Sequence, residues 1–292
     1  MKSAVKDMPA VSTDRVAASP STPARQTDQN PASATRRGRQ GGLSRAILNL
    51  KYWIWPGTNW VSRDKSAVVR HLLRGTDDRP VRTLDCGCGN AYFAHEAVRR
   101  GGTCLGITIH DWERQNCEVM RDFLGVPADR MEFRTDRLDR FADDSANHRA
   151  FDQVMMFDVI EHIMDAHAAM RQVHVLLDDN GFVFLTTPNR DWQANASQGR
   201  LSRHEDGWHV RNGYTFEQLE TVLEECGFEP IDRLRFGTLG STVVQKIQHG
   251  LFGRFIDPLT IAFFPALKAI SVLLSPWRDP HTICVIARKK SV

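Results

Sequence analysis

The chain has 292 residues, of which 41% are hydrophobic and 25% are charged. This balance is typical of a soluble globular protein, and a chain of this length buries enough apolar surface to need no disulfide or metal for its stability. The formal net charge of only +3 gives no support for nucleic-acid binding. The six cysteines form no CxxC pair and most lie in apolar stretches, so we expect reduced core thiols.

The first 80 residues differ from the rest of the chain. Residues 1–42 contain no Phe, Trp, Tyr, Leu or Ile, and such a segment cannot offset its ordering entropy by burial, so we predict a disordered basic tail. Residues 43–80 carry a cluster of Trp and Tyr residues and then apolar residues at helical spacing, which predicts a helical layer on the main domain. A second interpretation is an aromatic flap over a pocket or a membrane surface.

From Val81 the pattern alternates strands with helices. Apolar runs predict strands at 81–85, 103–109, 131–134, 151–157, 181–186, 231–236 and 282–287. Helical spacing predicts helices at 91–100, 111–124, about 166–177 and 216–226. This alternation predicts an α/β fold with a doubly wound, mostly parallel sheet of seven strands and helices on both faces.

The turn after the first strand, Leu84-Asp85-Cys86-Gly87-Cys88-Gly89-Asn90, carries the chemistry. Gly87 and Gly89 lack a Cβ, so a ligand can approach the backbone closely, and the following helix directs free N–H groups into the same space. Ligands of such sheets bind at the carboxyl ends of the strands, where Asp85 suits a cationic group. We expect a nucleotide-type site, but not a dinucleotide site, because Tyr92 replaces the third glycine of GxGxxG.

This turn resembles the first motif of the class I S-adenosylmethionine-dependent methyltransferases. Asp158-Val159-Ile160-Glu161-His162-Ile163 resembles the turn after that family's fourth strand, and Asn180–Asn189 resembles its fifth strand. Within the family, Phe151–Asn189 most resembles the O-methyltransferases that act on polyprenyl phenols in ubiquinone synthesis. Gly106-Ile107-Thr108-Ile109 looks more like the cyclopropane-fatty-acid synthase branch. The resemblance implies a Rossmann-like methyltransferase core with S-adenosyl-L-methionine as cofactor.

The resemblance also implies which residues contact the cofactor. The family's ribose-binding acid falls at Thr108, for which Asp111 or Glu113 could substitute, and the third glycine of its first motif falls at Ala91. The matching positions are Asp85, Cys86, Gly87 and Gly89 for the methionine part, Thr108, Ile109 and Asp136 for the nucleoside, and Phe157 and Asp158 beside the methyl group. For Asp136 the alternative is a solvated loop acid.

A hydroxyl acceptor must lose a proton, and histidine is the natural base near neutral pH. His162 follows the fourth strand closely enough to reach an acceptor, and the resemblance implies that the pair Glu161 and His162 serves catalysis, as it does in some members of the family. The alternative for His162 is a structural role at a helix start, in which case the base is His204 or His209 in the polar insertion 189–213, which we expect to roof the pocket. His110, Asp111 and Glu113 lack further ligands at metal spacing, so we expect no metal site.

About forty residues separate the last two predicted strands, where this family usually has a tight hairpin. Residues 258–276 are apolar on all sides and include Pro265, which we expect to kink a helix. Three interpretations remain open for this segment: burial under the N-terminal segment, an interfacial membrane helix, and a membrane span, for which it is short. The predicted parts are a tail at 1–42, an aromatic segment at 43–80, the methyltransferase core at 81–238, the insertion at 239–280 and the last strand at 281–292.

The sequence therefore predicts an S-adenosylmethionine-dependent methyltransferase that transfers to oxygen of an apolar, lipid-linked or polyprenyl-type small molecule. The alternatives are a lipid C-methyltransferase or cyclopropane-synthase-like enzyme, and a catalytically silent methyltransferase-like module. We expect a cytoplasmic protein, either free or peripheral on the inner face of the membrane, with a small-molecule substrate and no nucleic-acid partner. The sequence does not assign an oligomeric state.

Overall fold

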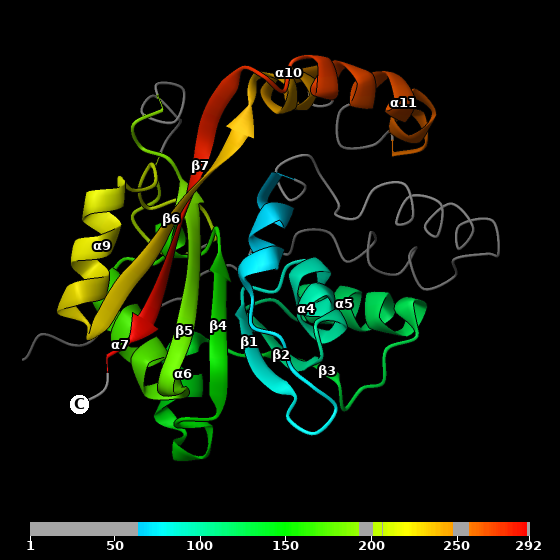
Figure 1. The fold of residues 1–292 in the computed structure, drawn as a ribbon. Helices are drawn as coiled ribbons and strands as arrows, with labels where there is room; N and C mark the ends of the chain where they lie inside the picture. Colours follow the sequence, from blue (N-terminus) through cyan, green and yellow to red (C-terminus); the bar gives the residue numbers. More distant parts are fainter. Residues whose placement is uncertain (1–63, 193–200, 206, 248–256, 291–292) are drawn as a thin grey trace, which may run out of the picture. The chain divides into compact units, whose positions relative to one another are not determined.

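A computed structural model describes residues 64–192, 201–205, 207–247 and 257–290 (Figure 1). The strands are β1 (Val81–Cys86), β2 (Gly102–Thr108), β3 (Met131–Thr135), β4 (Phe151–Phe157), β5 (Leu177–Pro188), β6 (Phe228–Thr238) and β7 (Arg278–Lys289). The α-helices are α4 (Tyr92–Arg99), α5 (Asp111–Leu124), α6 (Leu138–Asp143), α7 (Ala166–Leu176), α9 (Phe216–Glu225), α10 (Leu239–Ile247) and α11 (Asp257–Leu273). Three short 3-10 helices are η1 (Ser66–His71), η2 (Ser145–Asn147) and η3 (Ile160–His162).

The seven strands form one sheet in the order β3-β2-β1-β4-β5-β7-β6. Strands β1 to β5 pair in parallel, and β7 runs antiparallel between β5 and β6. The predicted doubly wound, mostly parallel sheet is confirmed. Because β1 and β4 are neighbours in the sheet while the chain leaves them in opposite directions, the crevice expected at such a switch point lies at their carboxyl ends.

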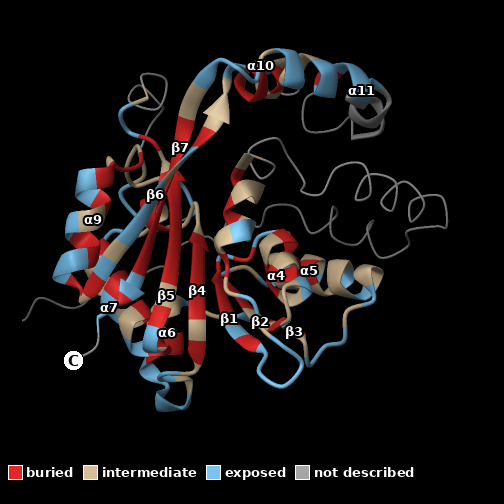
Figure 2. Cartoon of the chain, viewed as in Figure 1, coloured by how far each residue is buried: buried red, intermediate tan, exposed pale blue. Residues whose placement is uncertain are grey.

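Successive residues of each strand point to opposite faces, and this separates two hydrophobic cores. On β4, Val154 and Met156 belong to one core and Met155 to the other. The first core is completed by residues of α7 and α9, such as Met170 and Leu219. The second is completed by α4, α5 and η1. Figure 1 shows these helices on the two sides of the sheet, and Figure 2 shows the central strands as buried along most of their length.

Several predicted boundaries change in the structure. The helical spacing before β1 produces only the short η1, although Val68 and Leu72 from this stretch are buried in the second core. The helices α6 and α10 were not predicted: α6 has only six residues, and within the insertion a helix was expected only at 258–276. All six cysteines are free and buried, which confirms the predicted core thiols. Residues 1–63, with the predicted tail and aromatic cluster, lie outside the described residues.

The segment between β6 and β7 forms two helices, and α11 continues through Pro265 as one helix of 17 residues. The proline therefore does not end the helix, although it removes one backbone hydrogen bond, which is the physical basis of the expected kink. None of the helices in the described part of the chain is long and apolar enough to cross a membrane, so the interpretation of 258–276 as a span is not supported.

Candidate functional site

A cleft with a volume of about 380 Å³ lies at the carboxyl ends of β1, β2 and β4. Its walls come from the glycine turn, the start of α5, the loop after β3 and the turn after β4. The lining residues that the sequence predicted are Cys86, Gly87, Gly89, Thr108, Ile109, Asp136, Asp158 and His162. One hollow thus gathers most of the predicted site, although these residues span much of the core in sequence.

The glycine turn owes its shape to left-handed backbone. Gly87 has a φ of 73°, and a Cβ there would lie 2.5 Å from a methyl carbon of Val159, so only glycine lets β1 and the turn after β4 come this close. Ala91, at the family's third glycine position, also has a positive φ of 64° and directly precedes α4. An L-residue in this region costs about 1 kcal/mol, which explains the family's preference for glycine there.

Asp85 lies beneath this turn and does not line the cleft; only 3% of its surface is exposed. Burial raises its pKa to about 7, and a hydrogen bond from the backbone of Ala94 in the first turn of α4 acts in the opposite direction. In this structure Asp85 therefore contacts the start of α4. Phe157 likewise does not line the cleft, and its ring packs against Phe93 with the centroids 4.5 Å apart.

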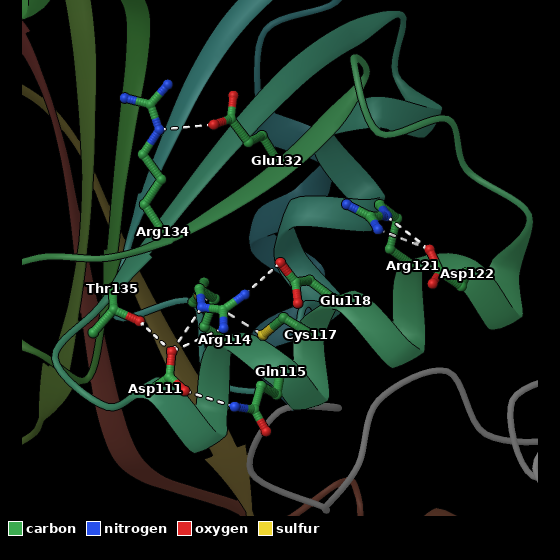
Figure 3. A network of polar contacts seen from close by, with 11 residues as sticks. Asp111, Arg114, Gln115, Cys117, Glu118, Arg121, Asp122, Glu132, Arg134 and Thr135 are labelled. Atoms are coloured by element: carbon green, nitrogen blue, oxygen red, sulfur yellow. Dashed lines mark hydrogen bonds and ion pairs between the residues drawn. The ribbon is translucent and has the colours of Figure 1, made fainter. Parts of the chain in front are cut away.

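At the end of β2, the position of the family's ribose-binding acid is occupied by Thr108, which pairs with Glu113. The hydroxyl of Thr108 donates a hydrogen bond to a carboxylate oxygen of Glu113 in the first turn of α5, and both side chains line the cleft. Asp111, the other acid considered, does not line it. Its carboxylate accepts hydrogen bonds from Arg114 and Gln115 of α5 and from Thr135 at the end of β3 (Figure 3). Glu113 is therefore the carboxylate of α5 that faces the cleft.

At the end of β4, Asp158 forms an ion pair with Lys65, which precedes η1. Partial burial pushes the pKa of Asp158 upward, but the charge of Lys65 and hydrogen bonds from Lys65 and Thr186 outweigh it, so the pKa lies below its usual range. Asp158 also has a positive φ of 56°, a strained conformation for a residue other than glycine. The carboxylate therefore stays ionised and is held firmly at the wall of the cleft.

His162, Glu161 and His209 lie together beside Asp158. The rings of His162 and His209 meet edge to face with centroids 4.6 Å apart, and the Nδ1 atom of His162 is buried without a hydrogen-bond partner among the described residues. Burial raises the pKa of Glu161 well above its usual value, and the charge of Asp158 adds to the rise. Burial and the neighbouring His162 lower the pKa of His209. Glu161 and His209 are therefore both favoured in their neutral forms.

These same three side chains offer atoms that could bind a metal ion, all within 4.8 Å of one another. The three residues considered from the sequence, His110, Asp111 and Glu113, form a different set, in which the side chain of Asp111 does not line the cleft. The cluster at Glu161 was not expected because His209 comes from another part of the chain.

The described part of the polar insertion 189–213 lies over the end of β4. Val210 donates a backbone hydrogen bond of 3.0 Å to Glu161, and Glu205 accepts one from the backbone of Met164. Glu205 and Gly207 line the cleft, whereas His209 lies behind His162 and His204 is exposed. This segment therefore forms one wall of the cleft and fixes His209 against His162.

Sequence reasoning missed several groups at the site. Lys65 gave no signal, because it is 93 residues away from its partner Asp158 in sequence. Arg137 and Asp139 line the cleft after β3 and form an ion pair, and Arg137 also reaches Glu205 in the insertion. Asp165, which also lines the cleft, caps the first turn of α7, and its place before a helical pattern is a signal that could have been used.

Residues 60–232, more than half of the chain, match the family described as a methyltransferase domain. The mitochondrial ubiquinone biosynthesis O-methyltransferase of Bos taurus is 27% identical over 153 residues, which are 50% of this chain and 41% of that protein. The ubiquinone biosynthesis O-methyltransferase of Dinoroseobacter shibae is 28% identical over 60% of this chain and 71% of that protein. This chain therefore matches less than half of the length of the mammalian relative.

Solved structures share the fold at lower identity. The cyclase SpnF aligns with a TM-score of 0.53 and 20% identity, over 81% of this chain and 84% of that one. A SAM-dependent methyltransferase from Archaeoglobus fulgidus aligns with a TM-score of 0.53 and 15% identity, over 83% and 99%. At these identities the likeness concerns the fold, which a cyclase and a methyltransferase share.

Proposed function

The chain belongs to the methyltransferase domain family, and we propose that it transfers the methyl group of S-adenosyl-L-methionine to an oxygen atom of an apolar small molecule. The observation that carries this proposal is the single cleft in which the glycine turn, the carboxylate of Glu113 and His162 meet. A glycine turn and a carboxylate suit a nucleoside with a methionine tail, and a histidine suits an acceptor that must lose a proton.

The cofactor would lie along the cleft from the glycine turn to the loop after β3. Gly87 and Gly89 would receive the methionine part, because neither carries a Cβ that would occupy the space. Glu113, oriented by Thr108, would accept hydrogen bonds from the two ribose hydroxyls. Ile109 and Asp136 line the adjoining wall, where Ile109 would contact the adenine ring and Asp136 its amino group. Asp85 would act indirectly, by holding the turn and the start of α4.

The bound cofactor supplies a methyl group whose bond to sulfur breaks as the bond to the acceptor oxygen forms. The acceptor's hydroxyl proton must leave in the same process, and the imidazole of His162, which lines the cleft, would receive it. His209, which lies behind His162 and is favoured in its neutral form, would orient the ring of His162 or receive the proton from it. The ionised carboxylate of Asp158 would stabilise a protonated His162, and its ion pair with Lys65 keeps it in place.

The proposed class of acceptor is supported by the relatives that this chain resembles. The relatives named above are O-methyltransferases of ubiquinone biosynthesis, which supports oxygen as the acceptor atom and a polyprenyl-type or lipid-linked acceptor. Such a substrate resides in a membrane, so we place the working enzyme in the cytoplasm at the inner membrane face. Residues Gly106–Ile109, with Thr108 in place of an acid, favour the second candidate, a lipid C-methyltransferase of the cyclopropane-synthase type.

The test is incubation of the protein with S-adenosylmethionine labelled in its methyl group and with either a lipid extract or an aqueous extract. Label on oxygen of a lipid product supports the proposal, label on carbon supports the second candidate, and a labelled aqueous product contradicts the apolar acceptor. Absence of any labelled product, despite binding of S-adenosylhomocysteine, would identify a silent module. The reaction is repeated with a chelator: turnover that persists supports proton transfer by the histidines, whereas loss that a divalent metal restores reassigns the Glu161 cluster as a metal site.

A further inference from the structure

The hairpin of α10 and α11 projects from the end of the sheet at which the cleft lies, beyond the carboxyl ends of the parallel strands. Strand β7 begins where β5 ends, because Thr282 pairs with Pro188, and Thr238 at the end of β6 pairs with Arg278. β5 is parallel to β4, so this is the edge at which β4 ends and the cleft opens. Figure 1 shows both helices beyond this end of β6 and β7.

The two helices pack on each other through a small core of their own. Val244 of α10 and Leu267 of α11 are buried, with Ile247 and Ile270 packed beside them. The helices approach so closely at Gly240 that a Cβ there would lie 2.3 Å from the carbonyl oxygen of Ser271. This contact buries one side of each helix, and the opposite side of α11 does not take part in it.

The outer side near the end of α11 is apolar and exposed. Val272 is 57%, Leu273 71% and Trp277 58% exposed. Leu239, at the start of α10, is 37% exposed, and its backbone N–H donates to the carbonyl of Trp277 at 2.8 Å, so it adjoins the same region. Large side chains gathered this way mark a surface that contacts another apolar phase. We call these four residues the apolar patch.

Cations surround the apolar patch. Lys268 lies one turn before Val272 on the same side of α11, Arg278 follows Trp277, and both are exposed. Over the insertion 239–280 the sequence holds four Lys or Arg residues against two acids, Asp257 and Asp279, whereas acids and cations nearly balance over the whole chain. An apolar patch with Trp at its border and a surplus of cations is complementary to the headgroup region of an anionic bilayer.

We propose that the α10–α11 hairpin docks on an anionic lipid bilayer through the apolar patch, with Lys268 and Arg278 at the lipid headgroups. None of the described helices could span a membrane, so the contact is a peripheral one. Docking by this hairpin sets the cleft edge of the sheet toward the membrane. The purpose of this contact rests on the proposed apolar acceptor, which would then reach the cleft directly from the bilayer, but the contact itself does not depend on methyl transfer.

The experiment is sedimentation of the full chain with vesicles of phosphatidylcholine alone or of equal parts of phosphatidylcholine and phosphatidylglycerol. The wild type should bind the anionic vesicles and be released by salt, because surface charge attraction is screened. The double variant Leu273→Ser with Trp277→Ser should bind about tenfold less, since it removes the most exposed apolar side chains. Val119→Ser, which changes a side chain 59% exposed on α5, is the matched control and should bind as the wild type does.

Binding of S-adenosylhomocysteine is measured for each variant, because none of these residues lines the cleft and all should retain it. Equal sedimentation with and without anionic lipid, or a double variant that binds like the wild type, would overturn the docking proposal. So would a wild type that does not sediment but forms a dimer that the double variant lacks, since the apolar patch would then meet a second copy. If the wild type does not bind S-adenosylhomocysteine, the proposed function is overturned, but the result with the vesicles still stands.

Discussion

The two halves of the cleft are built in different ways. The half proposed for the cofactor comes mainly from the continuous stretch 86–113, joined by the loop after β3. The half proposed for the acceptor is the turn after β4, whose Asp158 pairs with Lys65, 93 residues earlier, and whose His162 contacts His209 in the insertion. The cofactor half is formed mainly by residues that are close in sequence, so a sequence motif is enough to locate it. Tertiary packing assembles the second half, so only the structure shows which charged groups meet there.

The largest effect is expected in the acceptor half. His162→Ala should lower turnover by about 10²–10⁴-fold, the usual contribution of a positioned acid or base, while the affinity for S-adenosylhomocysteine stays within about twofold of the wild type. Steady-state kinetics and calorimetry on the same preparations check both values. His209→Ala is the comparison variant, and a larger loss of turnover in that variant than in His162→Ala would move the base to His209.

A pH effect on stability is expected beneath the glycine turn. The pKa of Asp85 is about 7 in the folded protein against an ordinary value of 3.8. Between these values the native state holds the extra proton, so this group makes the free energy of unfolding fall as the pH rises, by at most about 4 kcal/mol. Asp85→Asn should remove that fall. Denaturant unfolding of both proteins from pH 4 to 8 measures it, and two parallel curves would contradict the assignment.

A smaller effect should separate the two acids of α5. Glu113→Ala should weaken binding of S-adenosylhomocysteine by about tenfold, the loss expected for a hydrogen-bonded carboxylate. Asp111→Asn should bind normally, because its carboxylate is held by Arg114, Gln115 and Thr135 away from the cleft. A 2′-deoxyribose analogue should lose less affinity on Glu113→Ala than the parent compound does. Equal losses for the two compounds would mean that Glu113 does not contact the ribose.

The smallest effect concerns the backbone before α4. Ala91→Gly should raise the free energy of unfolding by about 0.5 kcal/mol, because relief of the left-handed strain exceeds the entropy cost of glycine. Ala94→Gly, within α4, is the control and should lower it by about 1 kcal/mol or more. Thermal unfolding of the three proteins provides the measurement. Destabilisation of similar size in both variants would show that Ala91 is not strained.

The sequence predicted the sheet well because its signals are local. Apolar runs located all seven strands, and the glycine turn located the cleft's first wall. It predicted less where the outcome depends on packing between distant segments. Thr108 alone did not show which acid would replace the family's carboxylate, since Asp111 and Glu113 differ only in which side of α5 they occupy. The ion pair of Lys65 with Asp158 and the contact of His209 with His162 are likewise products of the fold.

The helices between β6 and β7 show the same limit. Their apolar composition was evident, but three environments were compatible with it. In the structure none of the described helices is long and apolar enough to cross a membrane, and Val244 and Leu267 form a separate core between α10 and α11. Composition reports how much apolar surface exists, whereas only packing determines which side of it remains exposed.

The most direct test of the whole account is calorimetric titration of the wild-type protein with S-adenosylhomocysteine. The account predicts saturable binding of one ligand per chain, weakened by Glu113→Ala and unchanged by His162→Ala. An absence of heat and of any thermal shift at millimolar ligand would contradict it, because the cleft between the glycine turn and Glu113 would then not be a cofactor site.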